Sequence, residues 1–456
     1  MRFELAYPMT ASELSFAAEA TCPIDRERVI SAITTDSRLV RSGDLFIALR
    51  GQAQDGHHYI EDAKRLGAAL IIAEAEGIGT ACVTDTGRAL GNIAAHSLRK
   101  NRIPVVAITG SVGKTGAKDA VAAALGARMH VHKTADNQNN DFGVSYTILS
   151  RRREDEIMVL EFGTNNKGEI LHHAKIAPPD IAIITAIGSA HIGAFGSKEA
   201  ILAEKSDIYH EMRDGLLLLN GDDVYLKRLT PTIRTRYVGM NTECDLRADK
   251  TFFSRYGISY TLIEGGKEQR IFLRGAGIPR IYASLFAIAA AEHFGIRKEL
   301  AIGALYRMPE TEGRQHILSV GGILLIDDAY NASPEAMSEA LRLLSSLPAT
   351  GRRYAVLGDM LELGDLSEAL HRGVGMEAAK SADRLYCFGR YASAVADGAK
   401  IAGMPSEAIR ITDDAEACLS MLKPCLSDGD TVLVKASHAL GGERIVSGIR
   451  ALDTRS

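Results

Sequence analysis

A short glycine-rich segment contains the residues most suited to phosphate chemistry. It follows the apolar stretch 105–109 and precedes a predicted helix over 116–127. Glycines let backbone N–H groups converge on an anion, and the N-terminus of the following helix adds its positive dipole. We expect Lys114 to reach the terminal phosphates of a nucleotide and the Thr115 hydroxyl to ligate Mg²⁺. The predicted cradle consists of Gly110, Ser111, Val112, Gly113, Lys114 and Thr115.

This segment is a shortened form of the P-loop pattern. The full pattern has a further glycine five residues before Gly113, and this chain has Ile108 there. The alternative interpretation is an ordinary glycine-rich turn between a strand and a helix. The apolar strand before the turn and the helix after it favour a nucleotide site.

Two further candidates follow apolar stretches that are typical of buried parallel strands. Glu161 lies near the end of the stretch 157–162, and His191 follows the stretch 181–187. Ligands of open α/β sheets bind at the carboxyl ends of strands, where a carboxylate suits Mg²⁺. We predict Glu161 to be a metal ligand and His191 to be a metal ligand or a phosphate contact. The alternatives are a solvated acid and a structural histidine.

Other polar residues are weaker candidates when taken alone. Lys205 lies in a predicted helix, where a lysine is normally a solvated charge. The loop 137–143 is rich in Asn and Asp, and it either caps a helix or presents amides to a polar substrate. Acids that follow strands at 327–328 and 358–360 could bind ribose or Mg²⁺. The polar clusters 34–38 and 55–58 resemble turns more than sites.

The elements that must position these residues form three predicted blocks. The chain has 456 residues, which corresponds to about three domains. Strands alternate with helices, and several strands are continuous apolar runs that indicate a parallel sheet buried on both faces. The predicted fold class is therefore α/β, with domains at 1–102, 103–315 and 316–456.

Specific elements are expected within each block. In the first, strands are predicted at 44–49 and 69–73 and a helix at 59–66. The second contains strands at 105–109, 157–162 and 181–187, with a small antiparallel insert at 245–275. The third has strands at 323–326, 353–357, 384–388 and 431–434 and helices at 334–347 and 366–380, a doubly wound pattern.

Composition restricts the class of protein. A net charge of −4 gives no general attraction to nucleic acid or to anionic membranes. No apolar run approaches the roughly 18 residues of a membrane span, and the N-terminus lacks the apolar core of a signal peptide. The six cysteines (22, 82, 244, 387, 418, 425) contain no Cys-x-x-Cys pair. We therefore expect reduced thiols in a cytoplasmic protein, without a disulfide framework or zinc site.

Together these motifs resemble the Mur ligase family, which are ATP-dependent amide ligases of peptidoglycan assembly. The match extends in order over almost the whole chain. Segment 358–364, with Glu368 and His371, is typical of the branch that adds D-alanyl-D-alanine, and the Asp-Asn-Pro motif of the branch that adds the third residue is absent. The other matching segments are 35–38, 43–46, 55–57, 110–115, 139–143, 161–163, His191, 196–197, Lys205, 313–314 and 327–334.

The resemblance implies roles for individual residues. The N-terminal domain would bind the UDP part of a UDP-linked muramoyl peptide, the central domain would bind ATP, and the C-terminal domain would be Rossmann-like. Lys205 resembles the lysine that the family carbamoylates. The UDP-substrate site would comprise Thr35, Ser37, Arg38, Asp55, Gly56, His57, Asn139 and Asn140. ATP would also contact Arg314, Asp327, Tyr330 and Asn331. Mg²⁺ would be bound by Thr115, Glu161, His191 and Lys205, and catalysis would use Lys114, Glu161, His191 and Lys205.

The implied reaction joins D-alanyl-D-alanine to the muramoyl peptide through an acyl phosphate, in a protein expected to be a monomer. The chain departs from the family pattern at several positions. Pro279 and Ala283 replace a His-x-x-x-Asn step whose Asn helps to hold adenine, Gly193 replaces a frequent Glu, Gly116-Ala117 replaces a Thr-rich helix start, and His438 replaces a usual Arg. Two alternatives follow: a paralogue that uses another carboxylate or amine, and a nucleotide-binding scaffold without turnover.

Overall fold

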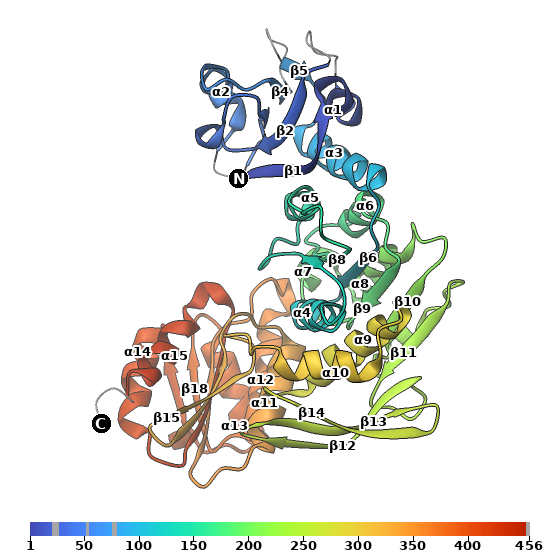
Figure 1. The fold of residues 1–456 in the computed structure, drawn as a ribbon. Coiled ribbons are helices and arrows are strands. Elements are labelled where there is room, and N and C mark those ends of the chain that lie inside the picture. The colour runs from blue at the N-terminus through green and yellow to red at the C-terminus, as the bar shows by residue number, and fades with distance from the viewer. Residues whose placement is uncertain (21–26, 52–53, 75–79, 453–456) are drawn as a thin grey trace.

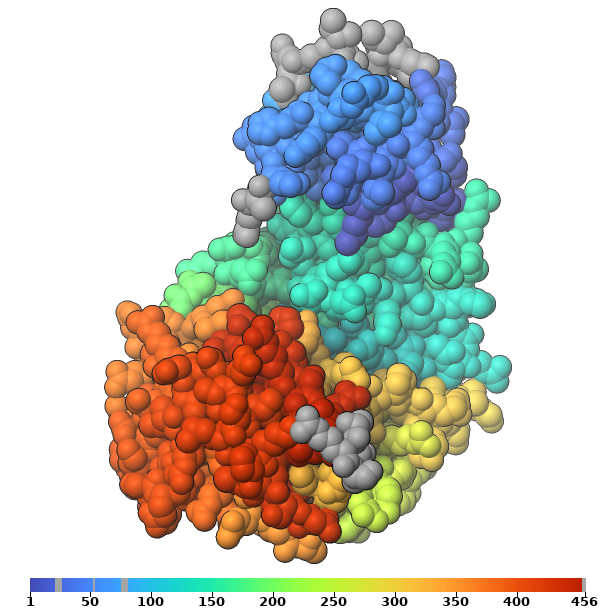
Figure 2. All heavy atoms as spheres, turned by 90° about the vertical axis from the view of Figure 1, so that its left-hand side faces the viewer, coloured from blue at the N-terminus to red at the C-terminus, as the bar shows by residue number. Residues whose placement is uncertain are grey.

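The computed structural model describes residues 1–20, 27–51, 54–74 and 80–452. Three sheets with their covering helices follow one another along the chain (Figure 1). The N-terminal and C-terminal blocks lie at opposite ends of the molecule, and the central block lies between them, as Figure 2 also shows. This mixed α/β architecture confirms the predicted fold class.

The N-terminal block is a sheet of order β1-β2-β3-β4-β5 in the described residues. β1 is antiparallel to β2, and the remaining pairs are parallel. The predicted strands and helix appear as β3, β4 and α2; the others were not predicted. The elements are β1 Arg2–Thr10, α1 Ala11–Ala17, β2 Val29–Thr34, η1 Ser37–Leu39, β3 Leu45–Ile47, η2 Gly56–Tyr59, α2 Ile60–Arg65, β4 Leu70–Ala73, β5 Thr80–Cys82 and α3 Thr86–Lys100.

The glycine-rich segment follows the strand at the centre of the middle sheet. The order is β7-β8-β6-β9-β10-β11-β12-β13-β14, so that β6 lies between β8 and β9 and is parallel to both. All residues of β6, β8, β9 and β10 are buried, as their apolar sequences predict. These strands are β6 Val105–Thr109, β7 Val131–Lys133, β8 Ile157–Glu161, β9 Ile181–Ile184, β10 Leu216–Asn220 and β11 Thr235–Gly239.

The predicted antiparallel insert is a continuation of the central sheet rather than a separate element. β12 (Leu246–Ser254) pairs in parallel with β11 and then antiparallel with β13 (Gly257–Glu264), which pairs with β14 (Lys267–Leu273). Gly265 and Gly266 join β13 to β14 with φ values of 53° and 77°. Two residues with positive φ are what a tight hairpin turn needs, and glycine adopts them without steric cost.

Helices cover both faces of this central sheet. α4 begins at Lys114, two residues before the predicted start, and packs against α9 and α10. The helical segments are α4 Lys114–Leu125, α5 Asp141–Leu149, α6 Glu169–Ile176, α7 Ile192–Phe195, α8 Lys198–Ser206, η3 Asp207–Tyr209, η4 Leu226–Arg228, α9 Ile278–His293 and α10 Lys298–Arg307.

The C-terminal block is a doubly wound sheet of order β15-β16-β20-β17-β18-β19 in the described residues. Its first strand, β15, was not predicted; it lies at the edge of the sheet and pairs antiparallel with β16, which contains the predicted strand 323–326. Its strands are β15 His316–Val320, β16 Ile323–Asp328, β17 Arg353–Leu357, β18 Arg384–Phe388, β19 Ile409–Thr412 and β20 Thr431–Lys435. Helices α11 Pro334–Ser346, α12 Ser367–Ser381 and α13 Ala392–Ile401 share one core, and α14 Ala415–Leu422 and α15 Gly442–Arg450 belong to another.

The N-terminal block docks on the central block through α3 and α5. α3 packs along α5, and its apolar face joins the same buried cluster as Val144 and Ile148. Phe3 of β1 stacks on Tyr146 of α5, with ring centroids 4.9 Å apart. The Thr35 hydroxyl lies 3.1 Å from the Tyr146 hydroxyl. This interface fixes the N-terminal turns relative to the central sheet.

Candidate nucleotide and metal site

The glycine-rich turn between β6 and α4 has the backbone shape of an anion cradle. Gly110 and Gly113 have φ values of 149° and 83°, which residues other than glycine rarely adopt. A Cβ on Gly110 would lie 1.9 Å from the Thr185 hydroxyl oxygen, so only glycine fits there. Thr185 follows β9, and its hydroxyl donates to the Val112 carbonyl at 2.5 Å. The neighbouring strand thus fixes the turn, a contact that the sequence did not indicate.

Lys114 lies at the centre of a group of charged side chains. Its Nζ donates to the Gly110 carbonyl at 2.8 Å, so the Lys114 side chain folds back over the cradle. Burial lowers the pKa of Lys114, the nearby Glu161 carboxylate raises it, and the Arg314 guanidinium lowers it. Arg314 belongs to the segment that enters the C-terminal block. β8 and the segment that leads into the C-terminal block therefore each place a charge near the same ammonium group.

Glu161 is a buried carboxylate with one oxygen free of protein partners. The pairing of β8 with β6 places Glu161 opposite Ile108, two residues before Gly110 at the start of the turn. Its Oε1 accepts from Asn139 Nδ2 at 2.9 Å, whereas Oε2 is buried without a hydrogen-bond partner. An unpaired buried carboxylate oxygen is costly unless a cation or ligand satisfies it. This orphaned atom is the observation in the structure that best fits a divalent cation.

His191 connects the central block to the C-terminal block. It has the left-handed φ of 62°, and its Nδ1 lies 2.6 Å from Glu362 Oε2. Burial lowers the pKa of His191, Glu362 raises it, and the ammonium groups of Lys114 and Lys205 lower it. The ring therefore lies within electrostatic reach of both lysines.

Lys205 of α8 is only 2% exposed. Burial lowers its pKa well below the usual value, Lys114 lowers it further and Glu204 opposes the shift. The carboxylate of Glu204 accepts from the backbone amides of Gly168 and Ile170 and thereby caps the N-terminus of α6. Lys205 is thus a buried amine held toward its neutral, nucleophilic form.

The donor set fits Mg²⁺ better than a metal that needs a full protein cage. No three His, Cys, Asp or Glu side chains of the described residues converge as a ready-made metal site. Mg²⁺ is usually held by one or two carboxylates together with phosphate oxygens and waters. The buried, unpartnered Glu161 Oε2 is a carboxylate oxygen of this kind, so the site fits a cation whose remaining ligands are phosphate oxygens and waters.

The predicted nucleotide residues of the C-terminal block lie at the ends of its strands. Asp327 of β16 accepts from the backbone amides of Gly313 and Ala329 at 3.0 and 3.3 Å. The Arg314 guanidinium lies over the Tyr330 ring, 4.1 Å from its centroid. The exposed His438 lies on the same ring, at a centroid distance of 5.7 Å.

Asn331 lies on the surface beside a buried ion pair. Its carbonyl accepts from Lys435 Nζ at 3.0 Å, and the same ammonium lies 2.7 Å from Asp328 Oδ2. Burial raises the pKa of Asp328 against the opposing effect of Lys435. These contacts fix the loop that carries Tyr330 and Asn331.

The predicted UDP-site residues near η1 make mainly local contacts. Arg38 forms a two-bonded pair with Asp36, and this pair lowers the pKa of Asp36 to about 2. Ser37 is nearly buried in η1. Thr35 contacts Tyr146, as described above. The Arg38 guanidinium is exposed, so a ligand can reach it.

A second turn contains Asp55, Gly56 and His57. His57 Nδ1 lies 2.6 Å from Asp55 Oδ1, and its Nε2 accepts from the Glu74 amide at 2.9 Å. A Cβ on Gly56 would lie 2.8 Å from the Leu49 carbonyl, so a larger residue would displace the chain. Both η1 and η2 pack on α2, which brings the two turns to one side of the sheet.

The asparagines of the loop before α5 have separate roles. Asn140 is the N-cap of α5, and its side chain accepts from the Gly143 amide at 2.9 Å. Asn139 instead donates to Glu161 and therefore contacts the predicted metal ligand. The interpretation of this loop as a helix cap therefore describes Asn140.

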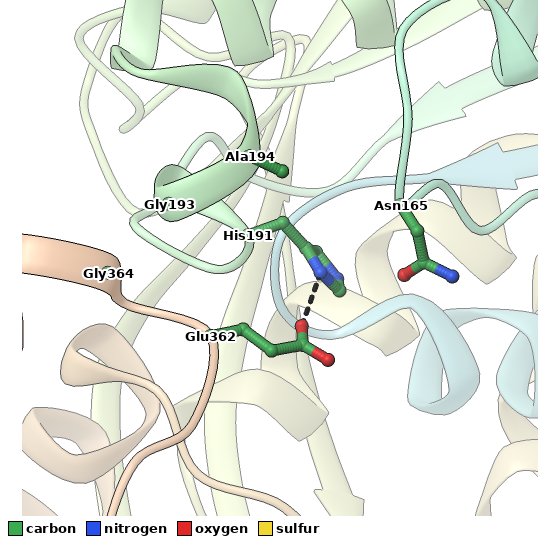
Figure 3. Close-up of a pocket in the computed structure, with 6 residues that line it drawn as sticks. All are labelled: Asn165, His191, Gly193, Ala194, Glu362 and Gly364. Carbon is green, nitrogen blue, oxygen red and sulfur yellow. Dashed lines mark ion pairs between the residues drawn. The ribbon is translucent and has the colours of Figure 1, made fainter.

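Sequence reasoning assigned no role to two carboxylates that reach the site from the C-terminal block. Glu335 of α11 accepts from the amide and hydroxyl of Ser189 at 2.9 Å and from Lys198 at 3.0 Å. Glu362 contacts His191 and lies with it on a pocket of about 340 Å³ (Figure 3). Glu362 falls in the segment 358–364, whereas nothing in the sequence marks Glu335.

The fold and the site define a nucleotide-binding protein in which a P-loop block closes against a second α/β block. Comparison with known proteins agrees with this class. Family models match residues 29–113 (Mur ligase family, catalytic domain), 108–291 (Mur ligase middle domain) and 313–438 (Mur ligase, glutamate ligase domain). The chain belongs to the Mur ligase family.

Relatives of this chain match over nearly its full length. UDP-N-acetylmuramoyl-tripeptide–D-alanyl-D-alanine ligase from Bacillus subtilis (strain 168) is 34% identical, with 94% of each chain covered. The ligase of the same name from Escherichia coli (strain K12) is 31% identical, with 92% of this chain and 94% of that protein covered.

Solved structures of similar proteins share the whole fold. MurF from Acinetobacter baumannii superimposes with a TM-score of 0.88 at 27% identity, covering 98% of this chain and 99% of that chain. MurF ligase from Thermotoga maritima in complex with ADP has a TM-score of 0.85 at 29% identity, covering 93% and 98%.

Proposed function

We propose that this protein is an ATP-dependent ligase that joins D-alanyl-D-alanine to UDP-N-acetylmuramoyl-tripeptide in peptidoglycan precursor synthesis. The observation that carries the chemistry is the convergence around Lys114 of the glycine cradle, Glu161 and Arg314. The full-length likeness to ligases of that name supports the choice of substrates.

Each block has a separate task in this proposal. Residues 1–102 bind the UDP part through the turns at 35–38 and 55–57, with Asn139 and Asn140 at the edge of the central block. The central block, 103–315, binds ATP along 110–115. The C-terminal block, 316–456, supplies Asp327, Tyr330 and Asn331, and Arg314 extends from the segment just before it.

The first step activates the substrate carboxylate. One carboxylate oxygen attacks the γ-phosphorus of ATP, the bond from that phosphorus to the β-phosphate bridging oxygen breaks, and ADP and an acyl phosphate form. Two anions must meet, so Lys114 and the backbone amides of the cradle offset their repulsion. Arg314 adds a second positive charge from the entry to the C-terminal block.

The second step forms the amide bond. The amine of the dipeptide attacks the acyl carbon, the carbon–oxygen bond to phosphate breaks, and the nitrogen loses a proton. Water would hydrolyse the acyl phosphate, so its exclusion is essential. The contacts of Glu335 and Glu362 with the loop after β9 hold the C-terminal block against the site and serve this purpose.

Mg²⁺ would be held by Thr115, Glu161 and His191, and it would neutralise charge on the transferred phosphate. Lys205 is proposed to react as a neutral amine with CO₂, forming a carbamate and releasing a proton. Its low pKa supports this, because the neutral amine is the reactive form. The carbamate anion would then add an oxygen ligand near Lys114.

We further propose that the protein acts in the cytoplasm as a monomer. The site is assembled from one chain, since His191 and Glu362 come from the two blocks that enclose it. Four cysteines, Cys244, Cys387, Cys418 and Cys425, have free thiols, and Cys22 lies outside the described residues. The helices of the described residues include none with the length and apolar character needed to cross a membrane.

Phosphate release from ATP tests the proposal. The assay contains Mg²⁺, UDP-N-acetylmuramoyl-tripeptide and D-alanyl-D-alanine, with each component omitted in turn. Release that requires every component, with a product heavier by the dipeptide less water, is the expected result. A protein that binds ATP but releases no phosphate would overturn the proposed substrates and point to a paralogue with another carboxylate or amine.

A further inference from the structure

Two residues in unusual backbone conformations face each other where the central and C-terminal blocks meet. His191 has a φ of 62° and Glu362 a φ of 64°, and neither is glycine. Their side chains meet with Nδ1 and Oε2 2.6 Å apart (Figure 3). Non-glycine residues keep such a conformation only where their surroundings fix it, and they concentrate at functional sites.

The backbone around this pair is closely fitted. The Gly193 amide donates to the Glu362 carbonyl at 3.4 Å. A Cβ on Gly193 would lie 3.0 Å from the Gly364 nitrogen and 3.1 Å from the Glu362 carbonyl oxygen. Gly193 is one of the positions where the chain departs from the family pattern. Its lack of a side chain lets the segment 362–364 approach the His191 loop.

The contact with Glu362 determines which imidazole nitrogen of His191 remains available to bind a metal. Nδ1 is the nitrogen that faces the Glu362 carboxylate, so a proton on Nδ1 leaves Nε2 with its lone pair as the nitrogen able to bind a metal. A carboxylate in this position also orients the ring and makes the ligand more basic. The loop before His191 is bonded to the cradle, because the Ser111 amide donates to the Ala186 carbonyl at 2.8 Å and the Ser111 hydroxyl donates to the Gly188 carbonyl at 3.4 Å.

We propose that Glu362 is a positioning residue that orients His191 for metal binding. Because Glu362 comes from the C-terminal block, the metal site is complete only when that block is docked on the central block. This inference rests on the metal-binding role of His191 in the proposed function.

A purely structural ion pair is the competing explanation, and Glu335 allows the two to be separated. Glu335 also comes from the C-terminal block and binds the same loop, at Ser189 and Lys198, without contacting His191. Glu362→Gln and Glu335→Gln therefore both weaken docking, but only the first alters the partner of the imidazole. The Glu362 side chain is 63% exposed, so its replacement leaves the core unchanged.

The experiment measures how strongly Mg²⁺ tightens the binding of a non-hydrolysable ATP analogue to the full-length protein. The dissociation constant is determined by calorimetry in EDTA and in saturating Mg²⁺, and the ratio reports metal binding through linkage. We expect Glu362→Gln to reduce this ratio about 10-fold, the scale found for carboxylates behind metal-bound histidines. Binding in EDTA should stay within about twofold of the unmodified protein.

Three controls decide the interpretation. Glu335→Gln should lose clearly less of the Mg²⁺ effect than Glu362→Gln, because its imidazole keeps the Glu362 partner, and the exposed Glu368→Gln should retain all of it. Glu362→Gln added to His191→Ala should cause no further loss, because both changes act through one ring. An unchanged ratio in Glu362→Gln, an equal loss in Glu335→Gln, or additive losses in the double variant would overturn the proposal. None of these measurements needs turnover, so they stand apart from the phosphate-release assay.

Discussion

The N-terminal turns and the strand-end site of the central block differ in how their polar groups are satisfied. In the N-terminal turns, Asp36 pairs with Arg38, and His57 is bonded at both ring nitrogens. In the central site, Glu161 Oε2 is buried without a partner, and Lys205 is buried with its pKa held low. One region is complete by itself, whereas the other retains groups that still need a ligand.

This difference shows where ligand chemistry can be inferred from a structure that contains no ligand. Asp and His side chains in turns form hydrogen bonds with the local backbone, so these residue types are accounted for without a bound substrate. Buried unpaired charge has no such explanation, because its desolvation must be offset by something bound. The structure therefore supports a ligand at the nucleotide site more strongly than a ligand at the UDP site.

The largest effect is expected at the centre of the unsatisfied region. Lys114→Ala should reduce ATP-dependent turnover by about 10²–10³-fold, since it removes the cation that faces the transferred phosphate. Thermal unfolding should remain close to that of the unmodified protein, because the Lys114 side chain bonds only the Gly110 carbonyl in the structure. Phosphate release is the measurement. Near-normal activity would remove the cradle from the proposed mechanism.

Lys205→Ala should be impaired on the order of 100-fold. If a carbamate acts here, short carboxylic acids should partly restore activity by entering the space of the lost side chain. Phosphate release is followed with and without added acetate or formate, and Lys198→Ala, on the same helix, serves as the matched comparison for rescue. Full activity of Lys205→Ala would contradict the carbamate, and equal acid stimulation of both variants would contradict specific rescue.

A substitution in the N-terminal turns, whose polar groups are paired with one another, should lower the stability of the fold. His57→Ala leaves Asp55 and the Glu74 amide without their shared partner, which should cost about 1–3 kcal/mol of unfolding free energy. Urea unfolding measures it, with the exposed neighbour His58→Ala expected within about 0.5 kcal/mol of the unmodified protein. Unchanged stability of His57→Ala together with a raised KM for the UDP substrate would show that this turn is not complete by itself.

The smallest expected difference concerns the nucleotide base. Ala283 of α9 is buried in the apolar core and offers no polar group to adenine. We therefore expect ATP and GTP to differ by less than about tenfold in kcat/KM, which corresponds to roughly 1.4 kcal/mol. Phosphate release with either nucleotide measures this. A strict preference for ATP would mean that other groups recognise the base.

Much of the architecture follows from local patterns in the sequence. The apolar runs at 105–109, 157–162 and 181–187 contain β6, β8 and β9, which are parallel neighbours in one sheet, although β8 ends at residue 161 and β9 at residue 184. Glu161 ends β8 and His191 follows β9. The antiparallel strands were predicted, but their attachment to β11 was not. Strand pairing depends on long-range contacts, which alternation along a single strand does not specify.

The parts that could not be predicted are contacts between blocks. Glu335 lies in the first turn of an ordinary amphipathic helix, and its role depends on a docking geometry that no local pattern encodes. The same holds for the pairing of Glu362 with His191, two residues that lie 171 positions apart in the chain. Thr185 lies inside the predicted strand 181–187, whereas β9 ends one residue before it, so its contact with the cradle was not predicted either.

The packing of α3 on α5 has a consequence for how the molecule opens. α3 precedes the sequence boundary near residue 102, yet Leu90, Ile93 and Leu98 are buried in the same cluster as residues of α5. Amide hydrogen exchange should therefore show α3 and α5 opening as one cooperative unit. A fragment ending at residue 102 would expose this apolar face to solvent. The boundary near residue 102 that the sequence predicts therefore does not separate two units that fold independently.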